Sequence, residues 1–169
     1  LDCNISSIWE LKKELEDIVI KFQLKPVIFS GIQALSNFTR EEKRYKKLAE
    51  TARKIYIFGF PDSETDMIPG MSPVRLNEDE YTKDIFLIIN GSDYYAALLA
   101  KEIKKDVFEA DKSVYKAFIT FERKIINSAI SSMNSVLLDK KVEIPPPAPV
   151  TDSFLAEVSQ KKMKTVLFH

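Results

Sequence analysis

The chain has 169 residues, of which 45% are hydrophobic and 30% are charged, and its 25 basic side chains balance its 25 acidic ones. This composition fits one soluble globular domain with short additions at its ends. The zero net charge argues against nucleic acid as a partner, and no apolar run approaches the roughly 18 residues of a membrane span. Because Cys3 is the only cysteine and no signal peptide opens the chain, we expect a reducing, cytoplasmic compartment.

The side chains that most enzymes use are nearly missing. The one histidine, His169, is the last residue, and Cys3 lies near the other end, where termini usually fray. The chain contains no Walker-type loop, no dinucleotide-binding glycine pattern, no His-Glu-x-x-His and no Cys-x-x-Cys. We therefore expect a binding or sensing module and not an enzyme. Because the chain starts at Leu1, we also expect a piece of a longer polypeptide whose remainder carries the output.

The first predicted element is a helix that ends before Pro26. Ser7 and Glu10 have the spacing of a capping box at its start. Apolar residues then recur at intervals of three and four, at Ile8, Leu11, Leu15, Ile18 and Phe22. This stripe has two interpretations, a helix that lies on the domain core and a helix that dimerises or carries a signal.

A strand, a helix and a second strand are predicted next. The strands are Val27–Gly31 and Ile55–Phe60, and Thr39 with Glu42 repeats the capping-box spacing at the start of a helix that runs to about Lys54. Such a crossover unit is typical of parallel neighbouring strands. Residues 61–73 are rich in proline and carboxylates and predict a loop or lid, and a short strand follows at 74–76. The carboxylate spacing matches no calcium loop, so we expect no metal site.

The second half of the chain predicts two more strands. The clearer one is 84–90, followed by an Asn-Gly-Ser turn and a helix over about 93–105. The other is 115–121, followed by a helix from Glu122 to about Leu138 with an apolar stripe. Residues 143–149 read as a stiff proline-rich linker, and residues 152–167 as a last short helix.

Together these elements predict an α/β fold. We expect a mainly parallel sheet of about four to five strands with helices on both faces, and helical segments at the N-terminal and C-terminal ends. The expected divisions are an N-terminal helix over 1–24, an α/β sensory core over 25–138, and a proline-rich linker with a C-terminal segment over 139–169.

Parallel strands would place one candidate site at their carboxyl ends, where open α/β sheets bind ligands. The residues predicted to line this crevice are polar, with two aromatic walls: Ser30, Phe60, Asp62, Asn90, Ser92, Tyr94, Thr120, Glu122 and Arg123. Each also has a structural explanation as a turn, cap or first-turn helix residue. We expect a small polar or anionic ligand there, and the residues leave its identity and any cofactor unknown.

Short motifs in the first crossover unit resemble the DICT family of sensory domains, which is associated with diguanylate cyclases and two-component systems. They are Phe29-Ser30, Leu35-Ser36-Asn37-Phe38-Thr39, Arg44-Tyr45, Leu48-Ala49 and Ile57-Phe58-Gly59. The resemblance covers about residues 25–138. It implies an intracellular domain that passes ligand occupancy or partner contact to an attached output, such as a GGDEF, EAL or histidine kinase unit, and it implies no catalytic residues.

The residues leave three functions open. The first is a sensory module in which a ligand shifts the terminal helices between two arrangements. The second is a ligand-free interaction module or homodimer, with a seam of Ile8, Leu11, Leu15 and Ile18 together with Ile126, Ile130, Met133 and Leu137. The third is a small hydrolase or transferase that uses Asp62, Glu122 and Arg123, because carboxylates can serve as acid and base without histidine.

Overall fold

The structure is a computed structural model that describes residues 2–64, 66–80, 83–104 and 113–145. Within these residues it contains one sheet of seven strands, in the order β1-β7-β6-β5-β2-β3-β4. The strands are β1 (Asp2–Cys3), β2 (Val27–Ala34), β3 (Lys54–Phe60), β4 (Met71–Arg75), β5 (Asp84–Asn90), β6 (Tyr95–Lys104) and β7 (Val114–Thr120). The helices are α1 (Ile5–Lys21), the 3₁₀ helix η1 (Leu35–Asn37), α2 (Phe38–Thr51) and α3 (Arg123–Asp139).

The prediction of a mainly parallel sheet of four to five strands is wrong. Among the seven strands of the described residues, only β2 with β3 and β3 with β4 pair in parallel, and the remaining neighbours are antiparallel. The decisive pairing is that of β5 with β2, in which Val27 lies opposite Asn90 and Ile32 lies opposite Ile85. The continuous apolar run of β5 reflects burial on both faces, which an antiparallel central strand shares with a parallel one.

The helix predicted over 93–105 is also wrong, because this segment is strand β6. The backbone N–H of Gly91 donates to the carbonyl of Tyr94 at 2.9 Å and closes a tight turn after β5. A Cβ at Gly91 would lie 2.8 Å from that same carbonyl oxygen, so the turn depends on glycine. The alanines and leucines of β6 favour a helix in isolation, but the turn returns the chain alongside β5 and cross-strand pairing overrides that propensity.

The helix starts differ from the predicted capping boxes. Asn4 caps α1, since its side-chain oxygen accepts a 2.9 Å hydrogen bond from the backbone N–H of Ser7. Thr39 lies inside α2, which begins at Phe38 and continues directly from η1. The start of α3 agrees with the prediction, because Glu122 is its N-cap residue.

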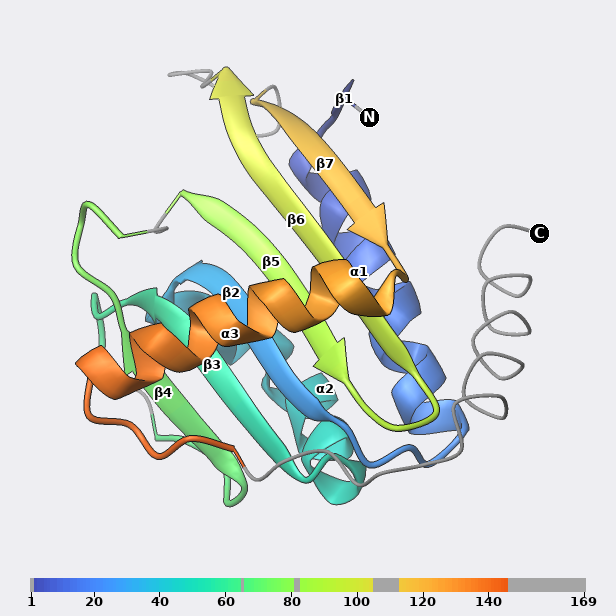
Figure 1. The fold of residues 1–169 in the computed structure, drawn as a ribbon. Coiled ribbons are helices and arrows are strands. Elements are labelled where there is room, and N and C mark those ends of the chain that lie inside the picture. The colour runs from blue at the N-terminus through green and yellow to red at the C-terminus, as the bar shows by residue number, and fades with distance from the viewer. Residues whose placement is uncertain (1, 65, 81–82, 105–112, 146–169) are drawn as a thin grey trace.

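In the described part of the chain, α1 and α2 cover one face of the sheet and α3 covers the other (Figure 1). The first core lies under α1 and α2 and contains Ile8, Leu15 and Tyr45 against strand residues such as Ile28 and Leu87. The second core lies under α3 and contains Ile126 and Leu137 with Phe29, Tyr56, Phe58 and Phe86. Most of the predicted dimer seam is therefore used inside the fold, since Ile8, Leu15, Ile18, Ile126 and Leu137 are buried. Helix α1 therefore lies on the domain core, which is the first of the two interpretations given for its apolar stripe.

The described residues leave three predictions untested: the division into segments, the last helix and the proline-rich linker. The division into segments at residues 24 and 138 stays a prediction, although α1 packs into the first core. The predicted last helix at 152–167 and most of the proline-rich linker lie outside the described residues. Among the helices in the described part of the chain, none is both long enough and apolar enough to cross a membrane.

Candidate functional site

The predicted strand-end crevice does not form as one site, because antiparallel pairing places the carboxyl ends of the strands on two opposite sides of the sheet. We call each side at which strands end an edge. The carboxyl ends of β2 and β3 lie at one edge and those of β5 and β7 at the other. Phe60 and Asp62 lie at the first edge, and Ser30 is buried within β2. The second edge holds the rest of the predicted set: Asn90, Ser92, Tyr94, Thr120, Glu122 and Arg123. Ligand binding by either group stays a prediction.

The second group is held together by Arg123. Its guanidinium donates to the side-chain oxygen of Asn90 at 3.3 Å, to the carbonyl of Gly91 at 3.1 Å and to the carbonyl of Ser92 at 3.2 Å. The same guanidinium lies 3.7 Å from the ring centre of Tyr95, and burial lowers its pKa. These contacts fix the start of α3 on the β5–β6 turn, which gives Arg123 a structural role.

Asp62 is occupied in a different way. Its carboxylate accepts hydrogen bonds from the hydroxyl of Ser36 at 2.5 Å and from the backbone N–H of Ser36 at 2.9 Å, and these bonds lower its pKa. Asp62 and Glu122 follow strands β3 and β7, which lie four strand spacings apart in the sheet and end at opposite edges. At about 4.8 Å per spacing, the two carboxylates are at least roughly 19 Å apart, too far for a paired acid and base.

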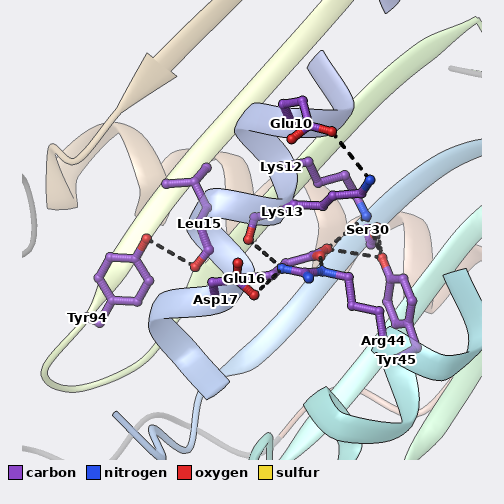
Figure 2. A network of polar contacts seen from close by, with 10 residues as sticks. All are labelled: Glu10, Lys12, Lys13, Leu15, Glu16, Asp17, Ser30, Arg44, Tyr45 and Tyr94. Carbon is purple, nitrogen blue, oxygen red and sulfur yellow. Dashed lines mark hydrogen bonds and ion pairs between the residues drawn. The ribbon is translucent and has the colours of Figure 1, made fainter. Parts of the chain in front are cut away.

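The most unusual polar group of the described residues lies where α1, α2 and β2 meet (Figure 2). Lys12 and Glu16 on α1 are both fully buried, and the Lys12 ammonium lies 2.8 Å from the Glu16 carboxylate. The ammonium also donates to the Tyr45 hydroxyl at 2.6 Å, and that hydroxyl lies 2.6 Å from the hydroxyl of Ser30. We call Lys12, Glu16, Ser30, Arg44 and Tyr45 the buried network.

Arg44 closes the network on the solvent side. Its Nε donates to Glu16 at 2.6 Å, and its Nη2 donates to the Asp17 carboxylate at 2.7 Å and to the backbone carbonyl of Lys13. Glu16 thus has a cation on each of its oxygens, Lys12 on one and Arg44 on the other. Since buried charges need partners and hydrogen bonds, this arrangement fixes how α1 lies against α2.

Burial and pairing act in opposite directions on the network. Burial alone would lower the pKa of Lys12, but the Glu16 carboxylate and the Tyr45 hydroxyl outweigh it and raise that pKa. Burial raises the pKa of Tyr45 to about 12. The directions of these two shifts favour a charged Lys12 and a neutral Tyr45, whose hydroxyl bridges Lys12 and Ser30.

A cavity of about 360 Å³ lies beside the network, between the N-terminal half of α1 and the first turn of α2. Its walls are mainly polar and come from both helices, from the end of β2 and from η1: Ile5, Ser6, Trp9, Glu10, Lys13, Gln33, Asn37, Arg40 and Glu41. Two of these residues also touch the network. The Trp9 ring centre lies 5.3 Å from the Lys12 ammonium, and the carbonyl of Lys13 accepts from Arg44. We call this space the α1–α2 cavity.

A second hollow, of about 390 Å³, lies at the other end of the same helices. It includes two of the predicted residues, Ser92 and Tyr94, together with the chain that follows α1 and with Arg53. Its lining comes from turns and helix ends, and none of its residues belongs to the buried network. The α1–α2 cavity is therefore the better placed of the two to change the contact between α1 and α2.

The sequence contained a signal for the buried network, but the apolar periodicity of α1 alone did not reveal it. Lys12 and Glu16 lie one turn apart on the same helix face as Ile8, Leu15 and Val19, so a charged pair interrupts the buried stripe. A charged pair within an apolar stripe predicts a buried ion pair only if another element of the fold covers the stripe. That element is α2, which brings Arg44 and Tyr45 from about 30 residues farther along the chain.

The side chains that usually bind metals do not gather into a metal site within the described residues. In the described ranges, no group of three or more His, Cys, Asp or Glu side chains is arranged so that it could hold a metal ion. Cys3 is a free, half-buried thiol on β1 whose pKa is raised by burial.

A family model described as "Sensory domain in DIguanylate Cyclases and Two-component system" (DICT) matches residues 2–103, which is more than half of the chain. The match begins before α1 and ends within β6, so it contains the α1–α2 cavity and the buried network. A search of curated proteins gives no match.

Among solved structures, the chain is similar to a polyphosphate kinase from Porphyromonas gingivalis, with a TM-score of 0.52 and 11% sequence identity. The similarity covers 98% of this chain but 28% of that one. At this identity the likeness describes the fold alone.

Proposed function

This chain belongs to the DICT family of sensory domains, and from that premise we propose that it is a cytoplasmic input domain that binds a small ligand in the α1–α2 cavity. A sensory role is what the family description states, and it fits the expectation that the chain is not an enzyme. The proposed output is an attached signalling unit of the GGDEF, EAL or histidine kinase type.

One observation carries the proposal: the cavity wall and the buried network share residues of α1. Trp9 lines the cavity and its ring centre lies 5.3 Å from the Lys12 ammonium, while Lys13 lines the cavity and its carbonyl accepts from Arg44. A ligand that contacts Trp9 and Lys13 therefore acts directly on the segment of α1 that the network binds to α2. Binding can shift an equilibrium only by its difference in affinity for two arrangements, and the contact between α1 and α2 is the part of the fold that we propose to differ between them.

Trp9 makes this proposal directly testable, because it is the only tryptophan of the chain. A ligand in the α1–α2 cavity changes the surroundings of its ring, so we expect a saturable change in tryptophan emission when small metabolites are titrated into the purified chain. Native mass spectrometry before and after denaturation would identify any ligand that co-purifies. A matched pair of variants on α2 separates the cavity from general effects, with Arg40→Gln in the wall and Lys47→Gln, exposed and outside it.

Two results would overturn the proposal. One is a bound compound that leaves Trp9 emission unchanged and is lost on mutation of the second hollow. The other is a chain that carries no ligand, responds to no compound and forms a stable dimer, which would favour the ligand-free interaction module.

A further inference from the structure

We infer that the ligand of the α1–α2 cavity is a zwitterion of the α-amino acid class with an apolar side chain. This inference rests on the proposed function, since it names the ligand class for the same cavity. It follows from three features of the lining residues, which are their charge balance, the partners already used and the apolar wall.

The charges of the cavity wall balance. Two cations, Lys13 and Arg40, and two carboxylates, Glu10 and Glu41, line the same space of about 360 Å³. A purely anionic ligand would meet both carboxylates, and a purely cationic ligand would meet both cations. A ligand that carries one charge of each sign can pair with both kinds of side chain, because charge-assisted hydrogen bonds gain from each.

The pair on α2 is available to a ligand. Arg40 and Glu41 are adjacent in the first turn of α2, and neither makes an ion pair or side-chain hydrogen bond with another described residue. The pair on α1 is weak, because Lys13 and Glu10 are 3.5 Å apart and their side chains are 40% and 72% exposed. Arg40 suits a carboxylate through its planar fork, and Glu41 suits an ammonium group.

The remaining wall is apolar on one side. Ile5 and Trp9 line the cavity, and the Lys12 ammonium lies 5.3 Å from the centre of the Trp9 ring. An apolar amino acid side chain placed on this wall removes apolar surface from water, which favours binding. The volume lies at the lower end of the roughly 300–1,000 Å³ that is usual for small-molecule sites, which suits a single amino acid better than a nucleotide.

The test uses the purified chain and the standard amino acids, titrated one at a time, with Trp9 emission and calorimetry as the two measurements. We expect saturable binding by at least one apolar amino acid, L-leucine or L-phenylalanine being the first probes. The N-acetyl and the carboxamide derivatives of that amino acid each lack one charge, and both should bind at least about tenfold more weakly.

Matched variants assign the charges to residues. Arg40→Gln should weaken the free amino acid at least about tenfold and leave the affinity of the carboxamide nearly unchanged, and Glu41→Gln should do the same for the N-acetyl derivative. Lys47→Gln and Glu50→Gln remove the same charges from exposed sites of α2 outside the cavity and should change neither.

The outcomes separate this inference from the proposed function. If no amino acid binds but another compound saturates the Trp9 signal, or if the charge-blocked derivatives bind equally well, the zwitterion is wrong and the sensory cavity stands. If no compound of any class affects Trp9 and none co-purifies, both fail. If Lys47→Gln weakens binding as much as Arg40→Gln does, the assignment of the ligand to this cavity is also wrong.

Discussion

Lys12 and Glu16 lie one helical turn apart on α1 and form a 2.8 Å ion pair whose side chains are both closed to solvent. Removing two charges from water costs several kcal/mol per ion, so such a pair persists only when further hydrogen bonds complete it. The Lys12 ammonium also donates a hydrogen bond to the Tyr45 hydroxyl, and Glu16 also accepts one from the Arg44 guanidinium. Since both partners come from α2, the pair sets the register of α1 against α2 more than it adds to stability.

The first prediction concerns the loss of one partner. Glu16→Gln removes the carboxylate while Lys12 and Arg44 keep their charges, so Lys12 becomes a buried ammonium without a counter-ion. We expect the free energy of unfolding to fall by about 3–5 kcal/mol. Urea unfolding at neutral pH measures the change.

The control for that experiment is an ion pair of the same spacing on the surface. Glu42 and Lys46 on α2 are four residues apart and 2.7 Å from one another, but both are exposed. Glu42→Gln should cost at most about 0.5 kcal/mol. Equal losses for the two variants would mean that the buried pair is not closed to water.

The second prediction is a loss of stability at alkaline pH. Burial raises the pKa of Tyr45 from 10.0 to about 12, so the folded state keeps a proton that the unfolded state releases. Stability from this group is fully present below pH 10 and is lost as the pH rises to about 12. The raised pKa of Lys12 acts in the same direction.

Absorbance of tyrosinate gives the measurement. In the folded chain the Tyr45 hydroxyl should ionise together with unfolding near pH 12, and Tyr45→Phe should lower the amplitude of that step by one tyrosinate, since burial also raises the pKa of Tyr56 and Tyr94. The variant should also be less stable by about 1–3 kcal/mol at neutral pH, because Lys12 and Ser30 lose a partner. An unchanged alkaline transition in Tyr45→Phe would contradict the assignment.

The third prediction concerns close packing between β2 and β5. Gly31 lies opposite Phe86, and a Cβ at Gly31 would be 2.3 Å from two carbons of the Phe86 ring. Because that ring is buried and packs on Phe58, it has little room to move. Gly31→Ala should therefore destabilise the fold by about 1–3 kcal/mol.

A second substitution tests the cause of that loss. Phe86→Leu in the Gly31→Ala background shortens the clashing side chain, so the double variant should lose less than the sum of the two single variants. Additive losses in the double-mutant cycle would mean that the two positions do not interact.

The fourth prediction concerns the turn between β5 and β6. Arg123→Lys keeps the charge but removes the planar fork that reaches Asn90, Gly91 and Ser92. We expect a loss of about 1–2 kcal/mol and faster amide hydrogen exchange at residues 90–95, with α1 unaffected. Lys124→Gln, at the neighbouring exposed position, is the control and should leave exchange unchanged; a protected turn in Arg123→Lys would contradict the role given to the guanidinium.

Local patterns predicted the elements well where burial alone decides them. The strands at 54–60, 84–90 and 114–120 were predicted within a few residues, since a buried strand is apolar whichever way it runs. The α3 helix was predicted from its apolar stripe and its start at Glu122. The family was identified from short motifs around Phe29, Tyr45 and Phe58, and the match over residues 2–103 confirms it.

The sequence by itself thus determined which segments are buried, where helices α1 and α3 lie and which family the chain belongs to, because these depend on local periodicity and side-chain type. Only the tertiary structure decided the direction of β5, the strand at 95–104 and the division of the predicted site between two edges. These depend on which strands pair, and pairing joins residues far apart in the chain. For the same reason, only the fold brought Lys12 and Glu16 together with Arg44 and Tyr45, and so revealed the cavity beside them.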